Sequence, residues 1–255
     1  MASAEQEGSG DNQIDQTIWN VIEHYQKELD GESELRDKIR TVVKEIDRDT
    51  KKINFILLSM HAKPTEENLK VIAAKARKMF ETAIHTSTSA LKEAVPVGDH
   101  YKYNDHWRIT FQRLAFVAAT TIYLETGTVC TLREAADLLG IMSAEDKESV
   151  DFKVFLDYED YLVGLVDMSA ELSRLARNCI TFGDNIAKVY SIHECMNKLT
   201  LGMHNITFKN DYLRKRYDGM KYHVKAVEEV IYDLKIRGLK VTNSNSDETA
   251  ATEPK

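Results

Sequence analysis

The distribution of proline constrains the fold of this sequence more than any other feature. Its 255 residues include three prolines, Pro64, Pro96 and Pro254, and a proline inside a helix removes a hydrogen bond and clashes with the preceding turn. The long proline-free stretches on either side of Pro64 and Pro96 are therefore compatible with long helices. Apolar residues recur three and four positions apart along them, and no segment alternates as a half-buried strand does. The sequence predicts an all-α fold.

We expect a single-domain bundle of about seven helices over residues 13–239. The expected boundaries come from capping residues and turn residues. Gly31 is expected to end a first helix and Ser33 to cap the second, while a capping box of Thr131 and Glu134 starts a short helix. The expected helices are 14–30, 33–60, 65–91, 106–125, 132–139, 158–180, 185–206 and 211–237, with loops at 94–105 and 151–157.

Composition limits the kind of protein. Residues 1–12 and 240–255 are polar and are predicted to be disordered tails. The formal net charge of −7 argues against a coat of basic surface for duplex DNA but permits a local basic patch. The three widely spaced cysteines are expected to be buried, reduced thiols. No signal peptide is visible, and the most apolar run, 114–124, is too short to span a bilayer, so we expect a soluble intracellular protein without a membrane partner.

The last expected helix carries the clearest heptad pattern. Its apolar residues follow strict 4-3 spacing, with Asp211 as cap and Gly238 as stop. Such a stripe packs either within the bundle or against another subunit, and the pattern alone leaves both open. We predict oligomerisation through this stripe, which comprises Leu213, Tyr217, Met220, Val224, Val227 and Ile231 and continues to Leu234.

Three basic clusters, two of them rich in aromatic residues, suggest binding of single-stranded nucleic acid. Cations contact phosphates and aromatic faces stack on unpaired bases. For each cluster the alternative is a solvated helix face with the aromatic residues in the core. The candidate binding residues are Lys75, Arg77 and Lys78 in the first cluster, Lys102, His106 and Arg108 in the second, and Arg214 and Lys215 in the third.

One pair of carboxylates is a candidate catalytic and metal site. Asp167 and Glu171 lie four residues apart, so they share a helix face, and two carboxylates facing a cavity can hold Mg²⁺ for phosphodiester hydrolysis. The alternative is an exposed acidic face in which Glu171 pairs with Arg174. No phosphate-binding glycine loop and no nucleophile elbow is present.

Several segments resemble the translin family. They are Lys209–Tyr222, Val227–Asp233 and Ile236–Gly238, together with Tyr158–Leu162, Glu171–Leu175 and Asp105–Arg108. The resemblance extends from about residue 18 to residue 239. In the C-terminal block the chain resembles the related family of translin-associated factor X less closely.

The resemblance implies a fold, partners and a function. Members of the family are seven-helix proteins that form closed octamers and bind single-stranded DNA and RNA. With translin-associated factor X they form a Mg²⁺-dependent endoribonuclease that removes passenger strands in RNA interference and processes tRNA, in the cytoplasm and the nucleus. The family's basic motifs correspond to the first and second clusters, and its assembly region to Leu213–Leu234.

Two departures from the family pattern bear on activity. Asn104 stands where a basic residue or histidine is common in the second basic motif. The metal-binding acidic set of the partner family is half present, because Asp167 and Glu171 match two positions while Arg113 and Phe116 occupy the others. We therefore expect a non-catalytic or weakly active subunit. Two alternatives stay open, a self-sufficient Mg²⁺-dependent ribonuclease homo-octamer and a purely structural helical scaffold.

Overall fold

The computed structural model describes residues 8–146, 153–182, 185–209 and 211–239, without the side chains of 8–17 and 211. The predicted tails lie outside these residues, except that residues 8–12 belong to the first helix. In the described residues no helix is long and apolar enough to cross a membrane.

Helices form nearly all of the described structure, as predicted. They are α1 (Gly8–Leu58), α2 (Glu66–Met79), α3 (His85–Ala94), α4 (His100–Tyr103), α5 (Arg108–Thr126), α6 (Leu132–Leu139), α7 (Tyr158–Phe182), α8 (Ile186–His204) and α9 (Asp211–Ile236). Short 3₁₀ turns occupy Ser59–His61, Asn104–His106 and Ala144–Asp146. A π-helical turn, Phe80–Ile84, joins α2 to α3, so these two helices correspond to the single helix expected after Pro64.

The prediction that Gly31 ends a first helix is wrong, because α1 runs unbroken to Leu58. Gly31 does not adopt the left-handed conformation of the glycines that end other elements. Inside a helix glycine costs only about 1 kcal/mol relative to alanine. Polar pairs four residues apart support the neighbouring turns, among them Gln26 with Asp30 at 2.8 Å and Glu23 with Lys27 at 2.9 Å.

The structure also contains a small sheet where the sequence indicated none. Strands β1 (Met142–Ser143) and β2 (Phe155–Leu156) pair in parallel, with Met142 opposite Phe155. Phe155 and Leu156 are buried, so the second half of the expected loop 151–157 is held by the core. The alternation that marks longer strands cannot appear in two residues.

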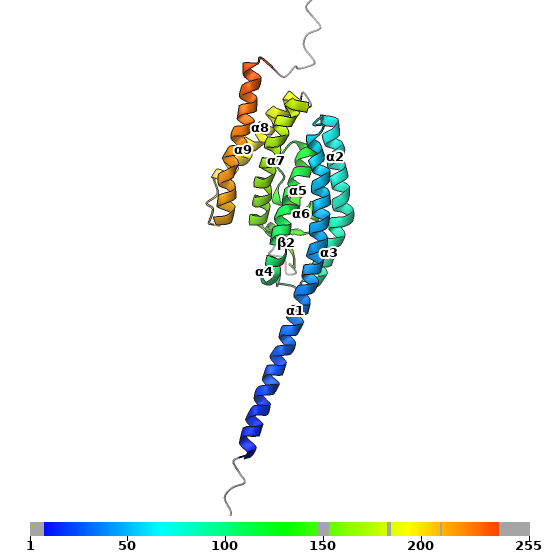
Figure 1. Ribbon diagram of the computed structural model, residues 1–255, viewed down its shortest axis with the longest axis vertical. Coiled ribbons are helices and arrows are strands. Elements are labelled where there is room, and N and C mark those ends of the chain that lie inside the picture. Colours follow the sequence, from blue (N-terminus) through cyan, green and yellow to red (C-terminus); the bar gives the residue numbers. More distant parts are fainter. Residues whose placement is uncertain (1–7, 147–152, 183–184, 210, 240–255) are drawn as a thin grey trace, which may run out of the picture.

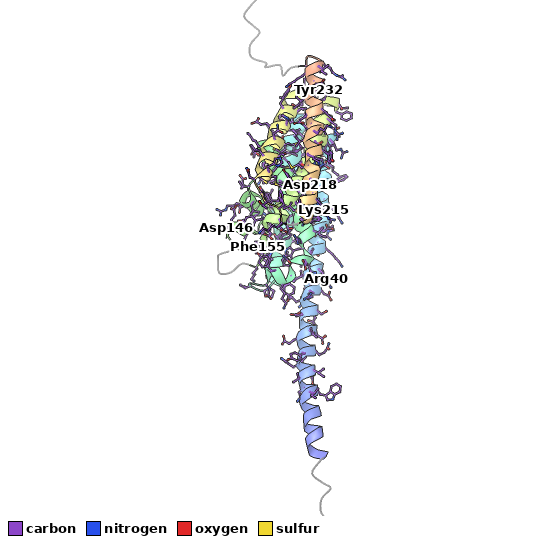
Figure 2. All side chains as sticks on the ribbon, turned by 90° about the vertical axis from the view of Figure 1, so that its left-hand side faces the viewer. Arg40, Asp146, Phe155, Lys215, Asp218 and Tyr232 are labelled. Carbon is purple, nitrogen blue, oxygen red and sulfur yellow. The ribbon has the colours of Figure 1, made fainter. Side chains whose placement is uncertain are left out.

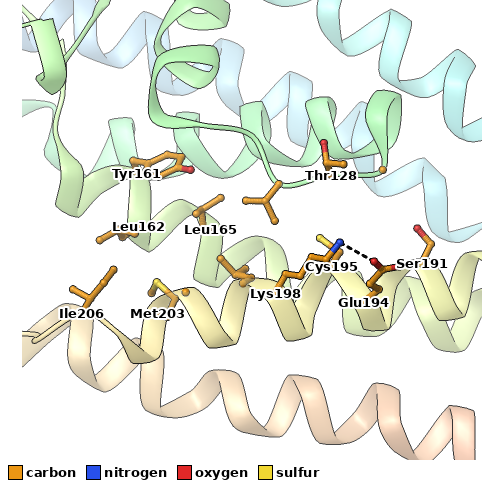
Figure 3. A pocket seen from close by; sticks show the side chains of 14 residues that line it. Thr128, Tyr161, Leu162, Leu165, Ser191, Glu194, Cys195, Lys198, Met203 and Ile206 are labelled. Atoms are coloured by element: carbon orange, nitrogen blue, oxygen red, sulfur yellow. Dashed lines mark hydrogen bonds and ion pairs between the residues drawn. The ribbon is translucent and has the colours of Figure 1, made fainter.

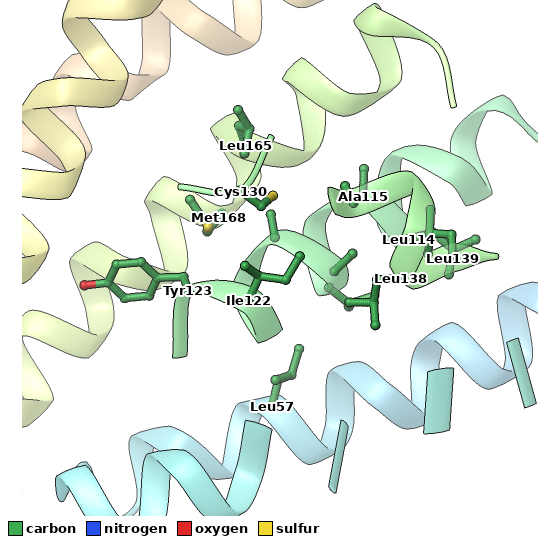
Figure 4. Close-up of a cluster of buried hydrophobic side chains, with 14 of the residues drawn as sticks. Leu57, Leu114, Ala115, Ile122, Tyr123, Cys130, Leu138, Leu139, Leu165 and Met168 are labelled. Carbon is green, nitrogen blue, oxygen red and sulfur yellow. The ribbon is translucent and has the colours of Figure 1, made fainter. Parts of the chain in front are cut away.

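The core is centred on α5, which is buried on nearly all sides as its all-round apolar sequence predicts. It packs against α1, α2 and α7 (Figure 4). The crossing with α7 is especially close, since a Cβ added at Gly164 would lie 2.7 Å from the Ala115 Cβ. The capping box of Thr131 and Glu134 is confirmed at the start of α6, and the three cysteines are free and buried.

The helices form a layered body from which one element projects. Helices α1, α2 and α3 lie on one side of α5, and α7, α8 and α9 lie on the other (Figure 1). The first half of α1 extends away from the body as a single helix (Figure 1). We call residues 18–33 of this projection the arm.

The C-terminal heptad stripe packs within the chain. Helix α9 lies against α7 and α8, and five stripe residues are buried, namely Leu213, Met220, Val227, Ile231 and Leu234. Tyr217 and Val224 are half-buried, and the Tyr217 hydroxyl lies 2.8 Å from His204 Nδ1. The stripe thus forms part of the subunit's own core, and its role in oligomerisation stays a prediction.

Candidate nucleic-acid interface

A group of basic residues gathers where the arm meets the body. Arg36 and Arg40 come from α1, and Lys102 and His106 come from α4 and the turn after it. The Arg36 guanidinium lies 5.7 Å from the centre of the Tyr103 ring, and Lys102 Nζ lies 5.4 Å from it. Burial and then the charges of Arg40 and Arg36 lower the pKa of His106. We call Arg36, Arg40, Lys102 and His106 the basic cluster; Figure 2 shows Arg40 where α1 enters the body.

Buried aromatic residues hold the segment that carries Lys102 and His106. Trp107 and Tyr103 are buried, and the ring of His100 stacks on Phe155 with a centroid distance of 3.8 Å. Burial lowers the pKa of His100 to about 4, so this imidazole is neutral near pH 7. Because these rings anchor the segment, its exposed cation, Lys102, keeps a fixed position relative to α1.

Carboxylates of the same chain already pair with the basic cluster. Lys102 forms an ion pair with Glu32, which lowers the pKa of that carboxyl, and Arg40 lies 3.1 Å from Asp37. These pairs are largely exposed, and exposed pairs contribute little stability. A phosphate can therefore replace or share such a carboxylate at low cost.

Arg108 has a more enclosed setting beside the cluster. It pairs with Glu159, and its Nε lies 3.6 Å from Asp160 Oδ1. Asp160 is buried, which raises its pKa to about 6, although the hydrogen bond from Gln112 and the charge of Arg108 oppose this shift. Gln112 Nε2 donates to Asp160 at 3.0 Å, and the Tyr212 hydroxyl donates to Gln112 Oε1 at 3.3 Å. This chain of contacts links α9 to the second predicted cluster.

The first predicted cluster lies elsewhere. Arg77 forms a two-bond pair with Glu125 near the end of α5, at 2.7 and 2.6 Å, whereas Arg108 stands at the beginning of α5. At 1.5 Å per residue these ends are roughly 25 Å apart. Lys75 and Lys78 are exposed on α2, so within one chain this cluster does not join the second.

The third predicted cluster is split by its helix. Lys215 is exposed on α9 (Figure 2), as is Arg214. Arg216, which follows them, forms an ion pair with Asp167 and lies 5.0 Å from the Tyr212 ring. Two cations thus face outward while the third is turned inward.

The paired carboxylates Asp167 and Glu171 do not fit a Mg²⁺ site. Asp167 is paired with Arg216, and Glu171 Oε2 lies 2.7 Å from His61 Nε2. Burial raises the pKa of Asp167, and the contact with His61 lowers that of Glu171. Arg113 pairs with Asp47 at 2.7 Å. In the described residues no three histidine, cysteine or acidic side chains come together as metal ligands.

A cavity of about 600 Å³ lies between α7, α8 and the segment after α5 (Figure 3). Its walls are mainly apolar. Among the described residues that line it, the one basic side chain is Lys198, which pairs with Glu194 at 2.7 Å. Phosphates need several cations, so this cavity does not resemble a strand-binding groove.

Comparison with known proteins places the chain in a family. Residues 34–238 match the Translin family. The chain belongs to the translin family. It is 38% identical to translin of Mus musculus and of Homo sapiens over 222 residues, which cover 87% of this chain and 94% of either protein. It is 20% identical to translin-associated protein X of Mus musculus over 248 residues, covering 91% of this chain and 83% of that protein.

Solved structures share the translin-family fold. Apo-NeC3PO has a TM-score of 0.57 at 19% identity, covering 91% of this chain and 98% of that chain. The AfC3PO complex with duplex RNA has a TM-score of 0.56 at 17% identity, covering 86% and 98%. The predicted fold class is thereby confirmed.

Arg36 and Arg40 belong to the candidate site of this translin-family chain, although the sequence did not predict them. They belong to a locally positive stretch, since residues 36–44 hold four basic side chains and the single carboxylate Asp37, and the sequence analysis did not single this stretch out. Their position along α1 was a second signal. Arg36 occupies a place in the apolar spacing of the helix, and Arg40 lies beside that spacing, at the point where the second cluster packs. Only the contact between segments 70 positions apart, seen in the pair of Lys102 and Glu32, makes that position informative.

Proposed function

We propose that this chain binds single-stranded RNA and DNA through the basic cluster and Arg108, as a subunit of an RNA-processing assembly. Membership of the translin family and likeness to C3PO structures support nucleic-acid binding. The observation that carries the proposal is the convergence of cations from two separate elements around Tyr103. Cations along phosphates beside accessible rings form a typical single-strand surface, and Tyr101 is 56% exposed next to Lys102.

The partner that we propose for this chain is translin-associated factor X, in a closed octameric endoribonuclease. Its substrates would be passenger strands in RNA interference and tRNA precursors, in the cytoplasm and the nucleus. We further propose that any Mg²⁺ used by the assembly is held by the partner, since Asp167 and Glu171 are already paired with Arg216 and His61.

Binding to the cluster is tested by the double variant Arg40→Gln/Lys102→Gln. We expect weaker binding of a short single-stranded RNA, measured by fluorescence anisotropy over a series of salt concentrations. The slope of log affinity against log salt should become shallower by about 0.7 for each phosphate that the variant no longer neutralises.

The matched control is Lys198→Gln/Lys235→Gln, which removes the same charge from exposed positions on α8 and α9. It should change affinity and slope much less than the cluster variant. Equal effects of the two double variants would mean that only net charge matters. Unchanged affinity in the cluster variant would reject this surface as the binding site.

The distribution of catalysis is tested with the pure chain and with the chain mixed with its proposed partner. We expect the pure chain to leave RNA intact in Mg²⁺ and the mixture to cleave it. Cleavage by the pure chain that is abolished in Asp167→Asn would instead support the self-sufficient ribonuclease.

A further inference from the structure

One heptad register runs along the whole of α1 and is only half used inside the subunit. The positions spaced 4-3 in the second half of the helix are buried; they are Ile39, Val43, Ile46, Thr50, Ile53 and Leu57. Met60, in the 3₁₀ turn that follows, continues the spacing and is also buried. The same spacing continues backwards into the arm through Ile18, Ile22, Tyr25 and Leu29. Between the arm and the buried half, at the edge of the body, two register positions are polar, namely Glu32 and Arg36.

The arm leaves this register uncovered. Residues 18–31 are all exposed, and the four apolar register residues are each 50–61% exposed. An isolated helix in water is marginal, and helices in proteins are stabilised mainly by packing of their apolar face. Because the arm keeps the apolar spacing of a packed helix, we expect its stripe to pack against a second helix.

The residues outside the described structure are too poor in apolar side chains to supply that helix. The residues outside the described structure have few large apolar side chains, namely Met1, Val150, Phe152 and Val241. The heptad stripe of α9 is already packed against α7 and α8. The match to the family model begins at residue 34, directly after the arm.

We propose that the arm pairs with the arm of a second copy of this chain, as an antiparallel two-helix coiled coil. In that register Ile18 faces Leu29 of the partner subunit and Ile22 faces Tyr25 of the partner subunit. Each layer of the coiled coil thus joins heptad position a of one helix to heptad position d of the other. The two copies use the same surface, so the interface is self-complementary about a two-fold axis.

Charge favours the antiparallel arrangement over the parallel one. A parallel pair would bring two basic clusters side by side, and like charges repel. An antiparallel pair separates them by roughly 40 Å, which is the length of about 25 helical residues. In the antiparallel pair the beginning of each α1 lies near the other copy's cations. This beginning is acidic, since residues 8–17 contain Asp11 and Asp15 and no lysine or arginine. Strand binding and arm pairing would then compete for these cations.

Cysteine pairs test the register in the full chain without nucleic acid. We expect an Ile18→Cys protein mixed with a Leu29→Cys protein to form a disulfide-linked heterodimer under mild oxidation. Neither protein should cross-link when it is alone. The native cysteines are buried, so the unmodified chain provides a low background.

Two controls make the result specific. Asn20→Cys mixed with Lys27→Cys places thiols on the outer face of the same helices and should stay unlinked. Adding Ile22→Asp to both cysteine proteins should abolish the 18–29 cross-link without lowering the thermal unfolding midpoint, because Ile22 has no core contact. Cross-linking of Leu29→Cys with itself, or equal linking of inner and outer pairs, would overturn the proposal, as would no linking at all.

Discussion

At the scale of the residue, the site is defined by charges that are partly satisfied within the chain. Lys102 and Arg108 each pair with a carboxylate, but the two settings differ. Lys102 and Glu32 are exposed to solvent, whereas Asp160 beside Arg108 is buried. The exposed pair contributes little stability, whereas the buried carboxylate is held by Gln112 and Arg108.

Asp160 gives a pH-dependent prediction. Burial raises its folded-state pKa from 3.8 to about 6, so the folded protein holds more protons than the unfolded chain between these values. Its contribution to stability therefore falls as pH rises from about 4 to about 6. We expect Asp160→Asn to stabilise the protein at pH 7.5 by on the order of 2 kcal/mol and much less at pH 4. Urea unfolding at both pH values measures the difference, and an equal effect at both would contradict this account.

At the scale of the element, close packing of α5 against α7 depends on Gly164. Its missing side chain leaves room for Ala115 and for the Phe116 backbone nitrogen, each 2.7 Å from an added Cβ. We expect Gly164→Ala to destabilise the fold by about 1–3 kcal/mol through overpacking.

The comparison variant for this helix crossing is Gly219→Ala in α9, where an added Cβ meets nothing within 4 Å. It should stabilise the protein by about 0.5–1 kcal/mol, because alanine loses less backbone entropy than glycine in a helix. Both values come from thermal or chemical unfolding. Similar signs for the two variants would show that helix propensity, not the crossing, governs Gly164.

At the scale of the whole molecule, two heptad stripes have different fates. The α9 stripe is buried in the subunit, and the arm is exposed. We expect Met220→Asp to lower the unfolding free energy by about 3–5 kcal/mol, since it leaves a charge buried without a partner. Tyr222→Asp, on the exposed face of the same helix, should change it by less than about 0.5 kcal/mol. If Met220→Asp instead left each subunit folded and only dissociated the oligomer, that result would support oligomerisation through the α9 stripe.

The sequence by itself determined what depends on neighbours a few positions apart. Apolar spacing, proline and capping residues located most helices, and the box of Thr131 and Glu134 formed as predicted. The exception was Gly31, where a local stop signal was outweighed by a helix stabilised further along at the core.

Tertiary structure decided which charges meet. Arg77 and Arg108 are both basic residues beside apolar helix faces, yet packing sends them to opposite ends of α5. The pairing of Asp167 with Arg216 and of Glu171 with His61 joins residues 49 and 110 positions apart. No local pattern encodes such contacts, because they depend on how whole helices pack. The gathering of Arg36 and Arg40 beside Lys102 has the same origin.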